Sequence, residues 1–441
     1  MQEERNRNNE LEGDEEGLIV LSQRPAEGET SIQATESQAA QKGERNDQPA
    51  IEQETPPGIS SQRPQEVRIV LTGGGTGGHI VPLIAVAREL TARSPNIEIH
   101  YVGSNGLTGK FFERENITLG IITSGKLRRY FSFKNFSDVF KLAAGTLQAL
   151  WKLYWFMPDA VFSKGGHGAF PVLLAAAFYR IPIMIHESDC VPGLVNQWGA
   201  RFASRIAISF DDTAKYFPKG KTVLMGNPIR GGLTESLEPQ STAKKLFGFH
   251  ADEPVLFIMG GSQGAEQIND FILDILTDLL RNYQLIHQVG DANIDDIKSE
   301  TDVILQDVSV DDRVRYKLFA FLSEGQYRDA MNAADIVISR AGSGSIFEIA
   351  AFAKPSILIP ISASAGDHQR LNAIAYFKAG CCIYLEEENL LPHLFLDQLN
   401  ELLVDRQRRE KMIEASRIFA RPRAAETAAR EILTLAKADN D

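Results

Sequence analysis

Short apolar runs alternate with longer amphipathic stretches from Val67 onward. Strands of a parallel sheet are buried on both faces and read as continuous apolar runs, so this alternation predicts βαβ units. The expected strands of a first series are Val67–Thr72, Ile97–Val102, Asp159–Ser163, Ile183–His186, Arg205–Ser209 and Thr222–Met225. Those of a second series are Val255–Met259, Gln284–Val289, Arg315–Phe319, Ile336–Ser339 and Ser356–Ile361.

A turn-rich segment separates the two series. It begins with Gly226-Asn-Pro-Ile-Arg230 and continues through Gly231–Ser241. The pattern therefore predicts an α/β chain with two Rossmann-like domains, residues 67–232 and 233–441, facing each other across a cleft. The C-terminal helix is a candidate to pack back on the first domain. Ligands of such folds bind where the strands end.

Residues 1–66 differ from the rest of the chain in composition. They hold 15 Asp and Glu against 6 Lys and Arg, a balance of −9 within a net charge of −12. With almost no aromatic residues they cannot bury enough apolar surface to fold, so we expect a disordered acidic extension. We expect no signal peptide, because a basic start followed by an apolar stretch is missing. The nearly neutral remainder gives no reason to expect nucleic acid as a partner.

Two further patterns bear on the compartment. No segment approaches the ~20 apolar residues of a membrane-spanning helix. Cys190 and the adjacent pair Cys381 and Cys382 have the spacing of neither a disulfide framework nor a metal site. A reducing cytoplasm is therefore the expected location of the folded part.

The loop Gly73-Gly-Gly-Thr-Gly-Gly-His79 follows the first strand and opens an amphipathic helix, Ile80–Arg93. Glycines let the backbone approach a ligand closely, and a helix start favours phosphate. The loop also satisfies G-x-G-x-x-G, but the second strand lacks the acidic residue that would hold a ribose, which disfavours a dinucleotide site. A tight turn that binds nothing stays the alternative. His79 is either a helix-start residue or a base that takes a proton from a sugar hydroxyl.

Two more loops open the second series. Gly260-Gly-Ser-Gln-Gly264 would suit a nucleotide diphosphate through Ser262 and nearby amides, with a bare turn as the alternative. Ser339-Arg-Ala-Gly-Ser-Gly-Ser345 precedes Glu348, whose carboxylate could accept both hydroxyls of a ribose. Alternatively, Ser345 and Glu348 form a helix capping box, S-x-x-E.

Together these loops resemble the MurG family, glycosyltransferases of the GT-B fold. The resemblance spans about residues 67–435 and rests on several motifs in one order. They are Gly73-Gly-Gly-Thr-Gly-Gly-His79 with Pro82, Ser124-Gly-Lys-Leu-Arg-Arg129, Ser163-Lys-Gly-Gly166, His186-Glu-Ser-Asp189 with Pro192-Gly193, Gly226-Asn-Pro-Ile-Arg230, Gly260-Gly-Ser-Gln-Gly264, and Asp367-His-Gln369 with Asn372-Ala373.

The resemblance implies an inverting transfer of N-acetylglucosamine (GlcNAc) from UDP-N-acetylglucosamine to the 4-hydroxyl of MurNAc-pentapeptide-pyrophosphoryl-undecaprenol. This step converts lipid I to lipid II in peptidoglycan synthesis. The acceptor would lie in the first domain and the donor in the second, and no cofactor or metal is expected. The residues implied at the donor are Thr76, Gly77, Gly78, Asp189, Arg230, Ser262, Leu322, Ser343, Gly344, Ser345, Glu348 and Gln369.

Within that set the resemblance assigns distinct roles. Arg230 and Ser262 would contact the diphosphate, Glu348 the ribose and Gln369 the sugar. The uracil contact falls near Leu322, where the local spacing is lengthened relative to the family. The two catalytic candidates are His79, the family's candidate base, and Asp189.

Asp189 marks a departure from the family pattern. Many members read His-Glu-Gln-Asn where this chain has His186-Glu-Ser-Asp189. An ionised Asp accepts hydrogen bonds but donates none, so the contact to the donor sugar must be arranged differently. Asp189 could support His79, serve as the base itself, or bond loop amides in an Asx-type turn.

A segment with basic and aromatic residues predicts contact with the acceptor's membrane. It holds Lys126, Arg128 and Arg129, and the aromatic residues Trp151, Tyr154 and Trp155 follow. Such a mixture suits an anionic bilayer surface, and we expect peripheral binding at the cytoplasmic face of the inner membrane. The alternative is that the Trp-containing helix packs in the core. Two rival functions also stay open: a GT-B transferase acting on diacylglycerol or another lipid, and an inactive nucleotide-sugar-binding relative.

Overall fold

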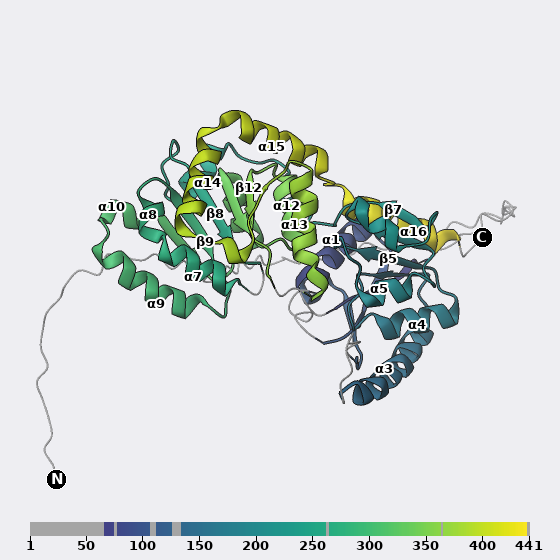
Figure 1. Ribbon diagram of the computed structural model, residues 1–441. Coiled ribbons are helices and arrows are strands. Elements are labelled where there is room, and N and C mark those ends of the chain that lie inside the picture. Colours follow the sequence, from purple (N-terminus) through teal and green to yellow (C-terminus); the bar gives the residue numbers. More distant parts are fainter. Residues whose placement is uncertain are drawn as a thin grey trace, which may run out of the picture. The chain divides into compact units, whose positions relative to one another are not determined.

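The computed structural model describes residues 66–74, 77–105, 112–125, 134–261, 264–362 and 365–438. These residues lie in one unit, Gln62–Asp441 (Figure 1). Five predicted site residues lie outside the described part: Thr76, Lys126, Arg128, Arg129 and Ser262. The acidic extension predicted for residues 1–66 also lies outside it, apart from its last residue.

The first sheet has seven parallel strands in the order β3-β2-β1-β4-β5-β6-β7. The strands are β1 (Arg68–Thr72), β2 (Glu98–Gly103), β3 (Thr118–Ile121), β4 (Ala160–Ser163), β5 (Ile183–Glu187), β6 (Arg205–Ile208) and β7 (Thr222–Leu224). The helices between them are α1 (Gly77–Arg93), α3 (Lys134–Phe156), α4 (Phe170–Tyr179) and α5 (Leu194–Gly199). The order reverses direction between β1 and β4, as in a Rossmann fold.

The second sheet repeats this design with six parallel strands in the order β10-β9-β8-β11-β12-β13. They are β8 (Val255–Met259), β9 (Gln284–Gln288), β10 (Tyr316–Phe319), β11 (Ile336–Ser339), β12 (Ser356–Leu358) and β13 (Ile383–Tyr384). The helices associated with it are α6 (Gln240–Leu246), α7 (Glu266–Asp274), α8 (Leu276–Leu280), α9 (Ile294–Ile304), α10 (Val310–Arg313), α11 (Glu324–Ala333), α12 (Ser343–Ala351), α13 (His368–Lys378), α14 (Pro392–Val404) and α15 (Arg406–Phe419). The predicted α/β class with two Rossmann-like sheets is confirmed.

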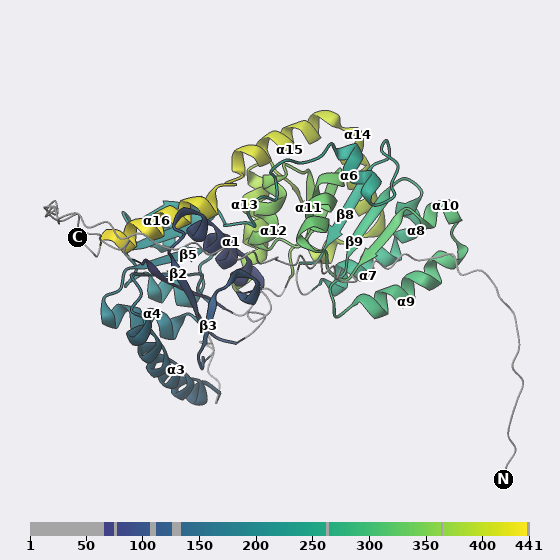
Figure 2. The same ribbon diagram turned by 180° about the vertical axis from the view of Figure 1, so that it is seen from behind.

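Alternating side chains divide the core of the first sheet into two layers. Ile69 and Leu71 of β1 pack on one face, with α1, and Val70 packs on the other, with α3 and α4. The last helix, α16 (Ala424–Ala438), also packs on the first of these faces, beside α1, although it follows the second sheet in sequence (Figure 2). Its buried face is made largely of alanines, which let the two helices approach closely.

The predicted strands agree with the observed ones within a few residues, but two edge strands were missed. In β3 all four residues are exposed or half-buried, and β13 has two residues. An edge strand is covered less than a central one, so its sequence lacks a continuous apolar run. Helix α1 begins at Gly77, three residues earlier than predicted. None of the helices described is both long and apolar enough to cross a bilayer.

Candidate active site

The glycine loops lie where the strand order of each sheet reverses. In the first sheet, residues 73–79 follow β1 and residues 164–169 follow its neighbour β4. In the second sheet, residues 260–265 follow β8 and residues 340–342 follow β11. Connections leave such a point toward opposite faces of the sheet, and the general rule for this fold predicts a ligand-binding crevice at the strand ends. The loops predicted to bind the substrates are therefore the loops at these two crevices.

His79 lies between the glycines of two loops. A Cβ atom at Gly74 would come within 2.9 Å of His79 Nδ1, and one at Gly166 within 3.4 Å of His79 Nε2. The Gly166 Cβ would also lie 2.8 Å from Gly74 Cα, and Gly166 has a φ of 80°. Only glycine combines that backbone conformation with so little space. The loops after β1 and β4 thus close directly around the imidazole.

The surroundings of His79 favour its neutral form. Burial, together with the nearby charge of Lys164, lowers the pKa of His79 to about 4, although the charge of Asp189 opposes the shift. A neutral imidazole has a free lone pair, which is the form needed to accept a proton. The site therefore presents His79 as a base at physiological pH.

Glu187 organises the loop that carries Asp189. Its carboxylate accepts hydrogen bonds from the backbone N–H of Asp189 at 3.1 Å, from Gly193 N–H at 3.0 Å and from Asn196 Nδ2 at 2.8 Å. The bonds to loop amides are thus made by Glu187, in place of the Asx-type turn considered for Asp189. Burial, with Asp189 nearby, raises the pKa of Glu187.

The carboxylate of Asp189 is bound by a residue of the second sheet's half. Asn372 of α13 donates from Nδ2 to Asp189 Oδ1 at 2.8 Å and to Ala341 O at 3.3 Å. Its Oδ1 accepts from the backbone N–H of Cys190 at 2.9 Å. Asn372 is fully buried. It joins the loop after β5 to the loop after β11, a role that the sequence did not reveal.

Arg230, Glu348 and Tyr327 form a second cluster at α12. Arg230 donates from Nε and Nη2 to Glu348 Oε1, at 3.1 and 3.0 Å. The Tyr327 hydroxyl donates to Glu348 Oε2 at 2.7 Å, and the guanidinium lies 4.2 Å from the Tyr327 ring centre. Two residues predicted to contact the donor thus contact each other, and Tyr327 is a partner that the sequence did not suggest.

The capping-box interpretation of Ser345 and Glu348 is wrong. The N-cap of α12 is Gly342, and no side chain caps the helix. Because Glu348 is engaged by a charged guanidinium and a hydroxyl, its carboxylate lies away from the helix start. Ser343, Gly344 and Ser345 form the first turn of α12, whose free N–H groups suit an anion. Gly77 and Gly78 take the same position in α1.

The remaining predicted donor contacts have local partners. Gln369, at the start of α13, accepts from the backbone N–H of Ile361 through Oε1 at 3.2 Å. Leu322 is buried in the core, and its backbone N–H donates to Gln288 Oε1 at 3.2 Å. The side chain of Leu322 therefore serves packing, and its uracil contact stays a prediction.

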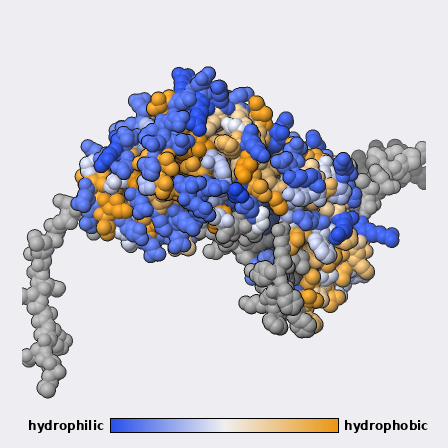
Figure 3. All heavy atoms as spheres, in the orientation of Figure 1, coloured by the Kyte–Doolittle hydropathy of each residue, from blue (hydrophilic) through white to orange (hydrophobic). Residues whose placement is uncertain are grey.

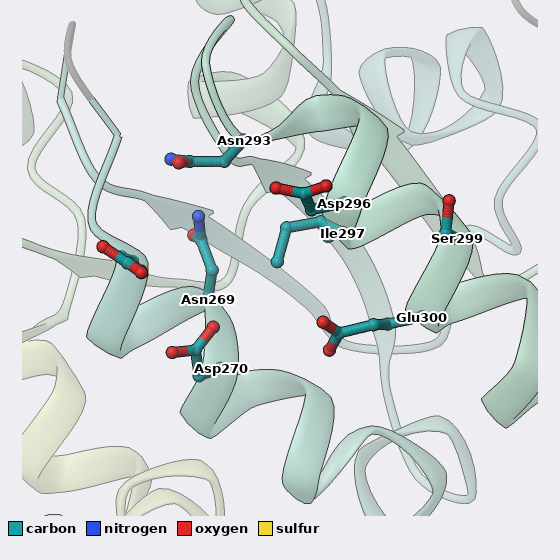
Figure 4. A pocket seen from close by; sticks show the side chains of 8 residues that line it. Asn269, Asp270, Asn293, Asp296, Ile297, Ser299 and Glu300 are labelled. Atoms are coloured by element: carbon teal, nitrogen blue, oxygen red, sulfur yellow. The ribbon is translucent and has the colours of Figure 1, made fainter.

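A hollow between α7 and α9 is chemically unsuited to a nucleotide (Figure 4). Its volume is about 430 Å³, and four carboxylates line it: Glu266, Asp270, Asp296 and Glu300. Burial and the neighbouring carboxylates raise the pKa of Asp270. Negative charge of this density repels a diphosphate, so the crevices at the strand ends remain the candidate site.

Comparisons with known proteins identify the family. The N-terminal domain of glycosyltransferase family 28 matches residues 69–208, and its C-terminal domain matches residues 255–428. The chain is 40% identical over 338 residues to a protein of Clostridium kluyveri named UDP-N-acetylglucosamine–N-acetylmuramyl-(pentapeptide) pyrophosphoryl-undecaprenol N-acetylglucosamine transferase. That match covers 76% of this chain and 91% of the relative. The chain belongs to glycosyltransferase family 28.

Further relatives support the same branch of family 28. A Clostridium tetani protein of the same name is 38% identical over 352 residues, covering 79% of this chain and 93% of the relative. The resemblance to the MurG family is confirmed, and the chain is a UDP-GlcNAc-dependent N-acetylglucosaminyltransferase of that family.

Solved structures share the fold at low identity. Acinetobacter baumannii MurG is 24% identical, with a TM-score of 0.65 over 83% of this chain and 99% of that one. A UDP-GlcNAc 2-epimerase from Neisseria meningitidis, bound to UDP-GlcNAc, is 14% identical, with a TM-score of 0.59 over 83% and 99%. The calicheamicin glycosyltransferase CalG4 has the same identity and TM-score over 84% and 98%. The expected GT-B fold is thus confirmed.

Proposed function

We propose that this family 28 member transfers GlcNAc from UDP-GlcNAc to MurNAc-pentapeptide-pyrophosphoryl-undecaprenol, forming lipid II from lipid I. The observation that carries the proposal is the 40% identity over 91% of a relative whose name states this reaction. The glycine-loop residues 73–79, 164–169, 260–265 and 340–342 lie within the ranges matched by the two family 28 domains, 69–208 and 255–428. Residues 67–232 would hold the lipid-linked acceptor and residues 233–441 the nucleotide sugar.

In the proposed reaction the acceptor's 4-hydroxyl oxygen attacks the anomeric carbon of the donor sugar. The bond from that carbon to the UDP oxygen breaks, and its electron pair leaves with UDP. His79 accepts the hydroxyl proton, which its neutral imidazole can do without prior deprotonation. Asp189 lies close enough to act on His79 electrostatically, and it would stabilise the imidazolium that forms.

The departing UDP gains negative charge that the second half can stabilise. The first turn of α12 offers free N–H groups, and Arg230 supplies a positive charge held in place by Glu348 and Tyr327. Because these groups are fixed before the reaction, little reorganisation is needed as charge develops. Ser262 would add a contact from the loop after β8, outside the described residues.

Exposed apolar side chains on α3 support peripheral contact with a bilayer. Phe140, Leu147, Trp151, Tyr154 and Trp155 are each 57–68% exposed. Their spacing places them along one side of the helix, whereas Ala149 and Leu153 of the opposite side are buried. The alternative that these aromatic residues pack in the core is therefore wrong.

The apolar area continues beyond α3. Phe178 at the end of α4 is 73% exposed, and Figure 3 shows hydrophobic side chains gathered over this part of the surface. Patches of this kind mark interaction sites, and aromatic residues favour the interface between lipid and water. Because the proposed acceptor is a lipid, we assign this surface to the membrane. The basic residues Lys126, Arg128 and Arg129 would supply the attraction to anionic headgroups.

The function is tested by two measurements on the same protein. Isothermal titration measures binding of UDP-GlcNAc, and a radiolabel assay measures GlcNAc transfer to lipid-linked MurNAc-pentapeptide and, separately, to diacylglycerol. We expect binding, and transfer to the muramyl lipid alone. Binding without transfer would instead support the inactive nucleotide-sugar-binding relative. Transfer to diacylglycerol alone would support the other rival.

Membrane contact is tested by co-sedimentation with vesicles of phosphatidylglycerol and phosphatidylethanolamine. Replacing both Trp151 and Trp155 by Ser should weaken vesicle binding. Ile418→Ser on α15 is the matched control, because that apolar side chain is equally exposed at 68%. Equal binding by the Trp variant and the control would refute the assignment of this surface.

A further inference from the structure

Lys164 is a buried lysine to which the proposed reaction has given no role. It directly follows β4, and the residue is 3% exposed. A lysine is almost never buried to this degree unless polar groups satisfy its ammonium group. Polar groups around Lys164 must therefore satisfy its amino group.

Three acceptors surround the amino group of Lys164. Its Nζ lies 2.8 Å from His186 Nδ1 and 3.1 Å from Asn227 Oδ1, and it also bonds Ser188 Oγ. His186 Nε2 lies 2.8 Å from the carbonyl oxygen of Gly226, which can only accept. The proton is therefore on Nε2, and Nδ1 is free to accept from Lys164. Three acceptors match the three N–H donors of an ammonium group.

These acceptors come from two different loops of the site. His186 and Ser188 belong to the end of β5 and the loop after it, and Ser188 directly precedes Asp189. Asn227 lies in the segment after β7 that leads to Arg230. Since Lys164 itself lies in the loop after β4, one buried amino group joins three connections that carry proposed site residues.

Lys164 and His79 both lie beside Gly73. A Cβ atom at Gly73 would lie 3.5 Å from the Cβ atoms of both Lys164 and His79. Two residues further along its loop, Gly166 closes on the His79 ring. The lysine is thus built into the side of the site that faces the candidate base.

We propose that Lys164 is a positioning residue of the transfer: its amino group holds the Asp189 loop and the Asn227–Arg230 segment in place beside His79. The proposal rests on the proposed function for its activity readout. It extends that function because none of the proposed roles above includes Lys164.

Electrostatics support this placement. Around His79, burial and the charges of Lys164 and His167 lower its pKa, whereas Asp189 raises it. Around Lys164, burial lowers the pKa, and Glu187 and Asp189 oppose the shift. Loss of the lysine charge therefore raises the pKa of His79. A base with a raised pKa is protonated sooner as the pH falls, so the acidic limb of the activity profile moves to higher pH.

The experiment compares three variants of the full chain over a range of pH. Lys164→Met removes the charge but keeps an unbranched side chain, and Lys164→Arg keeps a permanent charge with a different shape. Lys354→Met is the matched control, because Lys354 Nζ is also held by protein groups, the carbonyls of Asn332 and Ala334, away from the crevices.

We expect Lys164→Met to lower kcat on the order of 10²-fold, the typical effect of a small misplacement at a reacting centre, and to move the acidic limb upward. Lys164→Arg should lower kcat without moving the acidic limb of the activity profile, which keeps the test valid if the Met variant does not fold. Lys354→Met should leave both kcat and the acidic limb unchanged. The proposal would be overturned if the acidic limb of the activity profile did not move in a folded Lys164→Met variant. It would also be overturned if the limb moved in the Lys164→Arg variant.

A second readout does not depend on transfer. Selective labelling of the eight histidines with ¹³C allows the titration of His79 to be followed by NMR, with His79→Gln to assign its signal. The His79 pKa should rise in Lys164→Met and stay low in the Lys354 control. If wild type transfers no GlcNAc, the proposed function fails, whereas an unchanged His79 titration in the Met variant refutes the role of Lys164.

Discussion

Asn372→Asp should make the protein's stability strongly dependent on pH. In the wild type, Asn372 Nδ2 donates to Asp189 Oδ1 at 2.8 Å. The substitution places a second carboxylate at this distance while leaving an oxygen to accept from the Cys190 N–H. Because Asn372 is fully buried, the new charge cannot turn toward water.

The loss of stability is bounded by two energies: the repulsion between two ionised carboxylates, and the cost of protonating one of them. Two unit charges 2.8 Å apart repel by about 6 kcal/mol at an effective dielectric constant of about 20. The pair can avoid this by binding one proton, which costs about 4 kcal/mol at pH 7 against an ordinary Asp pKa of about 3.9. Since Asp189 is only partly buried, solvent reduces the penalty, and we expect a loss of about 2–4 kcal/mol at pH 7.

The sign of the pH dependence is fixed by the raised pKa of the carboxyl pair. The folded variant holds a proton that the unfolded chain releases, so its stability falls as the pH rises above about 3.9. Urea unfolding between about pH 5 and about pH 8 should show a slope of at most about 1.4 kcal/mol per pH unit relative to wild type.

A double variant provides the internal control. Combining Asn372→Asp with Asp189→Asn exchanges donor and acceptor across the same contact, so most of the stability should return and the pH dependence should disappear. If Asn372→Asp unfolds like the wild type near pH 8, or if the exchange restores nothing, the contact between Asn372 and Asp189 does not hold the two loops together.

Four further predictions concern single residues. His79→Gln should lower kcat by about 10²–10⁴-fold at neutral pH without changing the UDP-GlcNAc dissociation constant from isothermal titration. In the wild type, kcat/KM should fall as the pH drops toward about 4, where His79 becomes protonated. Ser345→Ala should change the free energy of unfolding in urea by less than about 0.5 kcal/mol, because the Ser345 side chain does not cap α12. A loss near 1 kcal/mol would instead show that Ser345 caps the helix. Gly166→Ala should lower the free energy of unfolding by about 1–3 kcal/mol in the same assay, since φ is 80° at this position and the added Cβ would lie 2.8 Å from Gly74 Cα. An unchanged free energy of unfolding would show that the two loops can move apart to make room for the methyl group.

Local signals in the sequence predicted most of the fold. The central strands were found because each is buried on both faces and reads as an apolar run. The edge strands β3 and β13 were missed because they are short or incompletely covered. The glycine loops were correctly predicted to follow central strands, because a loop that follows a central parallel strand lies at the strand ends whatever the rest of the chain does.

Contacts between distant residues could not be predicted. Arg230 reaches Glu348 across 118 positions, and this long-range ion pair prevails over the local capping pattern that Ser345 and Glu348 suggested. Asn372 and Asp189 are 183 positions apart, and each looked like a member of a separate motif. Lys164 was noted only as a member of the Ser163-Lys-Gly-Gly166 motif, and its burial and its three partners were not predicted, because a lysine in a glycine-containing loop is normally exposed.

The packing of α16 has a consequence for biosynthesis. The helix supplies part of the apolar layer on the first sheet, yet it spans residues 424–438. A ribosome releases the strands of that sheet long before this segment emerges. The nascent first half must therefore expose the apolar side of β4 and α1 to solvent while the whole second half is synthesised, and this layer of the core is completed only when the last helix arrives.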